Sequence, residues 1–223
     1  MNMRMMIAML GFAAGVSTLG AAESAVLKPF AAKEISSPVY EFGVKDGKPV
    51  KGRSHYAPEN LKSTDDGKVL LVHDHGDAKR EYQVITWGVP EFFGAKEGVC
   101  AFEWQIRVLS QQEKRPECFM LIARMGESKK TIRNAFFRIG KDHARTPWGV
   151  FPIDAASKPI VCRVLIDRAT GDAAFYVDGK FIAGGPVPAK EAAVSSAELI
   201  FGDGSNEVGG QVEIGYLKVG AFD

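Results

Sequence analysis

The sequence predicts an all-β fold in which two antiparallel sheets pack face to face. Apolar and polar residues alternate with a period of two over Ile160–Asp167 and again over Val99–Leu109, as in strands that bury one face. Asp178-Gly179 follows as a strong hairpin signal, because a type I′ turn needs two residues that tolerate positive φ. Helical periodicity is almost absent, and many short strands separated by turn residues are typical of a sandwich or barrel.

The first half of the chain is expected to hold short strands separated by long loops. Lys45–Asp66 is rich in Gly, Pro, Asn and Asp, which favours a loop with at most one short strand inside it. In chain order, the strands predicted from alternation or apolar content are Val39–Phe42, Ser54–Tyr56, Val69–His75, Tyr82–Trp87 and Val99–Leu109.

The second half is expected to hold the longer hairpins. Gly140–Ser157 is predicted to be a loop that carries Trp148, and Pro186–Ala193 one short helical turn. The predicted strands are Cys118–Arg124, Ile132–Ile139, Ile160–Asp167, Ala173–Val177, a return from Lys180, Glu198–Phe201 and Gln211–Val219. We find no repeat and no linker, so a single domain is expected.

Composition limits the class of partner. The 223 residues include 28 Lys and Arg against 27 Asp and Glu, a formal charge of +1. Nucleic-acid binding requires a clustered basic excess, so nucleic acid is not expected as a partner. A hydrophobic content of 46% suffices for a large core.

The first 22 residues have the three parts of a secretory signal peptide. Arg4 supplies the positive region, Met5–Val16 the apolar region, and Gly20–Ala22 the small residues before a cleavage site. We therefore expect an exported protein, periplasmic or extracellular, whose domain covers residues 23–223. No later run approaches the ~20 apolar residues of a membrane span, so no span is expected in the mature chain.

Three cysteines are present, and an exported protein can oxidise a pair of them. Cys100 and Cys162 share strand faces with large apolar residues, where a free thiol behaves as a small hydrophobe. The favoured interpretation is that these two and Cys118 are inert thiols, and a disulfide is the alternative.

Two motifs resemble a known superfamily. Phe175–Gly179 (FYVDG) before a hairpin, together with Ile200–Ser205 and the closing Gln211–Val219, resembles exported bacterial laminin-G-like and concanavalin A-like lectin/glucanase domains. The resemblance covers Val39–Val219. It implies a two-sheet antiparallel jelly-roll sandwich with its first strand beside its last, and a monomer whose partner is a carbohydrate or cell-surface glycan.

The resemblance does not extend to the catalytic motif of the glucanases. Retaining hydrolysis requires two carboxylates ~5 Å apart, and glucanases of this superfamily carry E-x-D-x-x-E on a strand of the concave sheet. The comparable stretch here keeps Glu103 but has Gln105 and Arg107 beside it, and Arg107 would hold Glu103 ionised. The Q-x-H pattern of alginate lyases is also absent. A hydrolase or lyase around Glu103 is the alternative to a protein without catalysis.

A sugar-binding face is the leading hypothesis for function. If three polar strand faces neighbour one another, they supply amides, guanidiniums and carboxylates to sugar hydroxyls, while Trp side chains at the rim stack on a pyranose. The candidates on the polar strand faces are Glu103, Gln105, Arg107, Asn134, Phe136, Arg138 and Arg163. The candidates at the rim are Trp87, Phe92 and Trp148. An ordinary solvated face with cross-strand ion pairs, as in a structural envelope protein, is the alternative.

Calcium is the cofactor that the sequence allows. Asp203 and Asn206 lie with Glu207 in an oxygen-rich stretch, and Glu213 would join Glu41 if the terminal strands pair. A simple Gly-Asp turn is the alternative. His73 and His75 have usable spacing for a transition metal but lack an identifiable third ligand.

Overall fold

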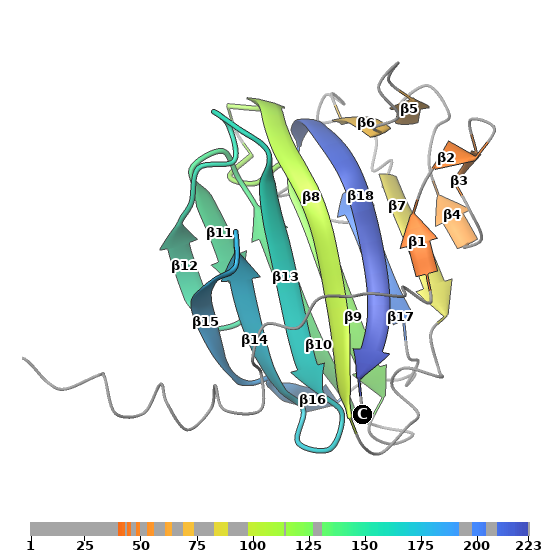
Figure 1. Ribbon diagram of the computed structural model, residues 1–223, viewed down its shortest axis with the longest axis vertical. Coiled ribbons are helices and arrows are strands. Elements are labelled where there is room, and N and C mark those ends of the chain that lie inside the picture. Colours follow the sequence, from red (N-terminus) through yellow and green to blue (C-terminus); the bar gives the residue numbers. More distant parts are fainter. Residues whose placement is uncertain are drawn as a thin grey trace, which may run out of the picture.

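The protein is a sandwich of two antiparallel sheets, as the sequence predicts (Figure 1). The computed structural model describes residues 40–42, 44–45, 48–49, 53–55, 61–63, 69–73, 83–88, 98–113, 115–126, 131–191, 198–203 and 209–222. Within these ranges the side chains are described for residues 98–113, 115–125, 133–189, 199–200, 202 and 209–220.

Sheet I forms one layer of the sandwich. In spatial order it contains β15 (Lys180–Pro186), β14 (Asp172–Val177), β13 (Ile160–Asp167), β8 (Val99–Gln111), β18 (Gly210–Phe222), β6 (Val69–His73) and β5 (Leu61–Ser63), with β1 (Tyr40–Phe42) beside β18.

Sheet II forms the other layer. In spatial order it contains β12 (Gly149–Pro152), β11 (His143–Thr146), β10 (Thr131–Ile139), β9 (Phe119–Gly126), β17 (Glu198–Asp203), β7 (Gln83–Gly88) and β4 (Arg53–His55), with β16 (Ala189–Glu191) beside β10. A separate two-stranded sheet joins β2 (Val44–Lys45) to β3 (Lys48–Pro49).

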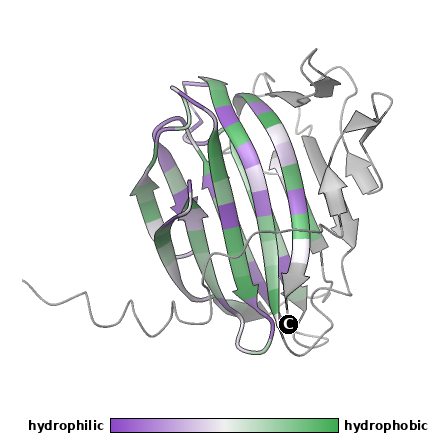
Figure 2. Cartoon of the chain, viewed as in Figure 1, coloured by the Kyte–Doolittle hydropathy of each residue, from purple (hydrophilic) through white to green (hydrophobic). Residues whose placement is uncertain are grey.

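The core lies between the two sheets and follows from period-two alternation. Even-numbered residues of β8 point inward, and Trp104 at their centre is fully buried. Its ring centroid lies 6.2 Å from that of Phe119 on sheet II and 6.3 Å from that of Phe175 on β14. Figure 2 shows the alternation as bands of opposite hydropathy along β8, β13 and β18. The odd-numbered residues of β8 therefore lie on the outer face of sheet I.

The hairpin prediction is confirmed. Asp178 and Gly179 have φ values of 48° and 76° between β14 and β15, the left-handed pair that a type I′ turn requires. Asp178 also accepts a hydrogen bond from the Val161 amide at 2.9 Å, which ties the turn to β13. Cys100, Cys118 and Cys162 are free and buried, so the prediction of inert core thiols is confirmed as well.

Two local predictions were wrong. Pro186–Ala193 contains β16 where a helical turn was expected, because Ala189–Glu191 pairs with the start of β10 and tertiary pairing overrides a weak local preference. Gly140–Ser157 contains the hairpin β11–β12 where a loop was expected.

The chain's first described strand pairs with its last, as expected. The register places Glu41 opposite Lys218, whereas Glu213 lies opposite Arg107 and Leu70. The expectation that Glu41 and Glu213 sit together is therefore wrong. Within the described ranges, no helix is long and apolar enough to cross a membrane.

Candidate functional site

The candidate ligand-binding residues do not form one groove. Glu103 on β8 lies directly opposite Arg163 on β13, both on the outer face of sheet I. Arg138 lies on β10 of sheet II, on the other side of the molecule. The expectation that three polar strand faces adjoin is therefore corrected, because alternation tells which residues share a face of a strand but not which sheet that strand joins.

On sheet I, Glu103 is almost completely engaged. It is 6% exposed, and its Oε2 accepts a hydrogen bond from Arg163 Nε at 2.6 Å and a second from Arg163 Nη2. The Tyr216 hydroxyl donates to Oε1 at 3.0 Å. The partner of Glu103 is thus Arg163, whereas Arg107, the partner expected from the sequence, lies across from Glu213.

Apolar side chains surround this ion pair. A small cluster of buried residues lies on the same outer face: Ala101, Leu165, Ala174 and Tyr176, with Val99 and Phe181 packed against it. Burial raises the pKa of Tyr176, and the Arg163 charge partly offsets that rise. Gln105, half-buried, lies opposite Tyr216 on the same face. A satisfied ion pair among buried apolar residues is the arrangement of a structural contact.

The outer face of sheet II is built differently. Its described side chains, which the register places next to one another, are Met120, Ile122, Arg124, Asn134, Phe136, Arg138, His143, Arg145, Val150, Pro152 and Ile200. Phe136 lies at the centre, half-buried and opposite Ile122. The Arg138 guanidinium carbon lies 5.7 Å from the Phe136 ring centroid, within the range of a cation–π contact. The oxygen of the Asn134 side chain makes no hydrogen bond to any described residue.

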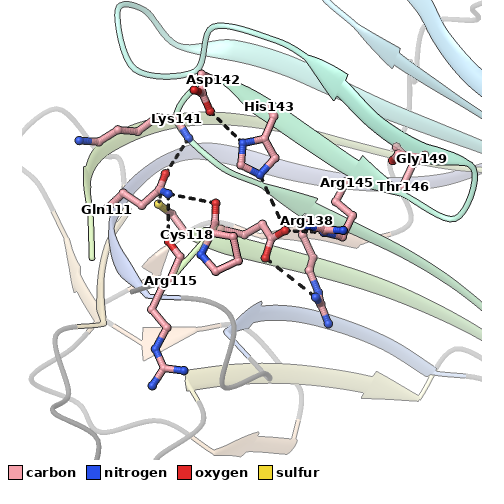
Figure 3. A network of polar contacts seen from close by, with 12 residues as sticks. Gln111, Arg115, Cys118, Arg138, Lys141, Asp142, His143, Arg145, Thr146 and Gly149 are labelled. Atoms are coloured by element: carbon pink, nitrogen blue, oxygen red, sulfur yellow. Dashed lines mark hydrogen bonds and ion pairs between the residues drawn. The ribbon is translucent and has the colours of Figure 1, made fainter. Parts of the chain in front are cut away.

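A buried carboxylate supports the arginine end of this face. Glu117 is fully buried, and Arg145 Nε donates to its Oε1 at 2.6 Å. Arg138 Nη1 lies 3.9 Å from Oε2, and His143 Nε2 lies 3.8 Å from Oε1. We call these four residues the Glu117 cluster, which Figure 3 shows with Asp142 on the far side of the imidazole. Asp142 contacts His143 Nδ1 at 2.8 Å, and that hydrogen bond lowers the Asp142 pKa.

One amide side chain fixes the segment that carries Glu117. Gln111 Nε2 donates to the carbonyls of Arg115 at 2.9 Å and Pro116 at 3.0 Å, while its Oε1 accepts from the Lys141 amide at 3.1 Å. This joins the end of β8 to the segments that precede β9 and β11 (Figure 3). These hydrogen bonds hold the segment that carries Glu117 between the ends of two strands. The Glu117 carboxylate therefore has a fixed position beneath the arginines.

Trp148 is the predicted rim aromatic whose side chain is described, and it does not stand on an outer face as expected. The Trp148 ring packs against the core, with its centroid 6.1 Å from that of Phe137, and its indole nitrogen donates to the Pro186 carbonyl at 3.3 Å. Trp87 belongs to β7, opposite Leu199 in register, but its side chain lies outside the described residues, as do Phe92 and its surroundings.

The proposed calcium ligands are only partly described. Asp203 ends β17, with its side chain outside the described set, and Asn206 and Glu207 lie wholly outside it. Glu213 lies opposite the Arg107 cation. In the described part of the chain, no three His, Cys, Asp or Glu residues gather closely enough to hold a metal ion. His73 ends β6, and His75 lies beyond the described residues.

Comparison with known proteins supports the fold and gives no family. No protein-family model and no curated protein matches the sequence. Among solved structures, the chain is similar to a carbohydrate esterase from Shiga toxin-encoding bacteriophage phi24B, at 11% identity and a TM-score of 0.57, covering 84% of this chain and 99% of the esterase. Likeness at this level shows a shared fold only.

Two other solved structures are larger than this chain. Botulinum neurotoxin type C, described with two ganglioside molecules, matches at 11% identity and a TM-score of 0.50 over 82% of this chain. An engineered GH43 glycoside hydrolase matches at 12% identity and a TM-score of 0.51 over 86% of this chain. The chain spans 46% of the toxin and 42% of the hydrolase, less than half of either.

Sequence reasoning missed most of the outer face of sheet II. It identified Asn134, Phe136 and Arg138 but gave no role to Glu117 or Arg145. The residues of His143–Thr146 are alternately half-buried and buried, as in a strand. This strand could have been predicted from the sequence, but the following Pro147 obscured it. Glu117 carried no signal, because only the fold brings it beneath Arg145, 28 residues further along the chain.

Proposed function

We propose that this protein is an exported glycan-binding β-sandwich and that the outer face of sheet II contacts the glycan. The observation that carries the proposal is the half-buried Phe136 ring flanked along β10 by Asn134 and Arg138. An aromatic ring offers an apolar surface to the C–H face of a pyranose. Amide and guanidinium groups on either side offer hydrogen bonds to its hydroxyls. The likeness to a carbohydrate esterase, a ganglioside-dependent toxin and a glycoside hydrolase supports a carbohydrate ligand.

Binding is favoured over catalysis by the state of the carboxylates. Glu103, the residue around which a hydrolase was expected, is held by Arg163 and Tyr216 and is nearly buried. Glu117 is fully buried beneath its arginine. A retaining glycosidase instead requires two carboxylates that reach one glycosidic bond.

The test is a glycan-array screen of the mature protein, followed by titration of the best ligand. Phe136→Ala and Asn134→Ala should each weaken binding about tenfold, the loss of one good contact. Arg107→Ala on sheet I is the matched control and should leave affinity unchanged. If Arg107→Ala weakens binding while the two sheet II variants do not, the ligand binds the opposite face. If the wild-type protein releases shortened products from the ligand, an enzyme is the better interpretation.

Two further parts of the proposal are export from the cell and a structural calcium ion. Export rests on the signal-like residues 1–22, and N-terminal sequencing from the native host should begin near Glu23. A structural calcium ion near Asp203 and Asn206 remains a prediction. A rise in melting temperature on adding calcium to chelator-treated protein supports it, and an unchanged melting temperature contradicts it.

A further inference from the structure

The outer face of sheet I carries apolar side chains that are buried. Ala101 on β8 and Ala174 on β14 are fully buried. Leu165 on β13 is 2% exposed, and Tyr176 on β14 is 5% exposed. An antiparallel sheet commonly packs one face on the core and leaves the other in solvent. Because the core already occupies the inner face of sheet I, burial of the outer face requires a second cover.

These side chains form one continuous patch. Leu165 lies opposite Ala101 on one neighbouring strand and opposite Ala174 on the other. The members of the patch, which we call the sheet I cluster, are Val99, Ala101, Leu165, Ala174, Tyr176 and Phe181. All six belong to sheet I, and side chains stand roughly perpendicular to their own sheet. On the outer face of sheet II, by contrast, Ile122 and Phe136 are only half-buried.

The first described strand enters the sandwich level with this cluster. Tyr40 on β1 lies opposite Val219 on β18, which lies opposite Phe102 on β8. Phe102 is the neighbour of Ala101 in the cluster. The strands follow one another in the order β1, β18, β8, β13 and β14 (Figure 1). At a spacing of ~4.8 Å, β13 lies ~14 Å and β14 ~19 Å from β1.

The residues before Tyr40 have the length and composition to cover the cluster. Residues 30–35 read Phe-Ala-Ala-Lys-Glu-Ile. An extended chain covers ~3.3 Å per residue, so Ile35 can lie up to ~16 Å and Phe30 up to ~33 Å from Tyr40. Both distances suffice for β13 or β14. The exposures given above are those of a single chain, so the atoms that bury the cluster belong to this chain.

We infer that residues 30–35 cross β18 and β8 and pack Phe30 and Ile35 on the sheet I cluster. The chain would then cover one outer face of its own sandwich and leave the outer face of sheet II open to a ligand. Residues 89–97, which include Phe92, are the competing cover. They connect β7 of sheet II to β8 of sheet I and must span the ~10 Å between the sheets. Residues 30–35 precede the first described strand and are free of that constraint.

The experiment measures how fast an added thiol reacts with Ellman's reagent in the otherwise complete protein. The three natural cysteines are buried, so an added thiol reports on its own position. Ala174→Cys places it in the cluster. Leu109→Cys, near the end of β8 at a position that is 43% exposed, is the control. Ala174→Cys should react about 100-fold more slowly than Leu109→Cys, because access limits the reaction of a covered thiol.

Substitutions in the covering segment identify it. Phe30→Asp together with Ile35→Asp should raise the rate at Ala174→Cys about tenfold, because a carboxylate is costly to bury against apolar side chains. The same pair should leave the rate at Leu109→Cys unchanged, and Phe92→Asp should leave both rates unchanged. Circular dichroism and melting temperature establish that each variant folds. If Ala174→Cys does not fold, Leu165→Cys gives the same comparison.

Three results would overturn the inference. Equal rates for the cluster thiol and Leu109→Cys would show that the outer face of sheet I is open. Protection that persists with Phe30→Asp and Ile35→Asp but is lost with Phe92→Asp would assign the cover to residues 89–97. Protection that weakens on dilution would assign it to a second copy of the chain. Glycan binding is tested separately by the sheet II variants and does not depend on these results.

Discussion

Each outer face of the sandwich has a glutamate that accepts a hydrogen bond from an arginine, but the surroundings of the two glutamates differ. On sheet I, Glu103 is satisfied by Arg163 and by the Tyr216 hydroxyl, among buried apolar residues. On sheet II, Glu117 lies beneath two arginines and a histidine that remain partly exposed. The first carboxylate accepts two hydrogen bonds from one guanidinium and lies opposite Lys218 in register, and it is almost completely buried. The second carboxylate is surrounded by basic side chains that reach the surface, and that difference is why sheet II is the candidate site.

The largest expected effect is at Arg145. Arg145→Ala removes the 2.6 Å hydrogen bond to Glu117 and leaves a fully buried carboxylate, so it should lower the free energy of unfolding by about 3 kcal/mol. Urea denaturation measures this loss. Arg145→Lys, which keeps a cation, should lose less. A change within about 0.5 kcal/mol for Arg145→Ala would mean that Arg138 and His143 already satisfy Glu117.

A smaller loss is expected at the equivalent position on sheet I. Arg163→Ala leaves Glu103 with the Tyr216 hydroxyl and with Lys218 opposite it in register, so the expected loss is about 2 kcal/mol. Tyr216→Phe, which removes one hydrogen bond, should lose about half as much. The same denaturation series applies, and a loss at Arg163 exceeding that at Arg145 would reverse the comparison.

The buried thiols provide a pH test on both sides of the core. Burial raises the pKa of Cys100 and of Cys118 from 9.0 to about 12. The unfolded chain therefore loses these protons first, and stability falls as pH rises from 9.0 towards about 12 while remaining unaffected below 9.0. At pH 10 each thiol should account for about 1 kcal/mol.

Cysteine variants identify the source of that alkaline loss. Cys100→Ala tests sheet I and Cys118→Ala tests the start of sheet II, and each should make the stability curve shallower between pH 9 and 10. Thermal melts across this range are the measurement. Parallel curves for variants and wild type would place the alkaline sensitivity in other groups.

The smallest expected effect is at Asp142. Its hydrogen bond with His143 holds the Asp142 pKa below its ordinary value, yet the side chain is almost fully exposed. Its contribution is present at neutral pH and is lost as pH falls through that lowered pKa. Asp142→Asn should change stability by at most about 0.5 kcal/mol at pH 7, because exposed pairs contribute little. A larger loss would show that Asp142 helps to place the imidazole beside Glu117.

The sequence predicted the fold through local signals. The alternation of β8 and β13 and the Asp178-Gly179 turn are properties of adjacent residues, and all three were found where expected. The free, buried cysteines followed from the same alternation. Patterns of this kind depend on the pleat of a single strand, so they can be seen without knowing what the strand packs against.

The candidate site was less predictable because it depends on strand order. Arg138 was grouped with Glu103 and Arg163 because all three occupy polar strand faces, but β10 joins the other sheet. Glu117 lies in an irregular segment before β9, and its contacts with Arg138, His143 and Arg145 come from neighbouring strands. Trp148 looked like a surface aromatic in a loop, whereas the β11–β12 turn folds its ring against Phe137.

The position of β18 in sheet I has a consequence for biogenesis. This strand lies between β8 and β6 and also pairs with β1. The pairing of Trp104 on β8 with Leu217 on β18 therefore cannot form until β18 has been synthesised. During synthesis, sheet I cannot close until the C-terminal strand emerges from the ribosome. Contacts this distant in sequence favour slow folding, in milliseconds to seconds, which stopped-flow refolding of the mature chain would measure. A chain that cannot complete its core early stays open for longer, which is what the proposed export as an unfolded polypeptide would require.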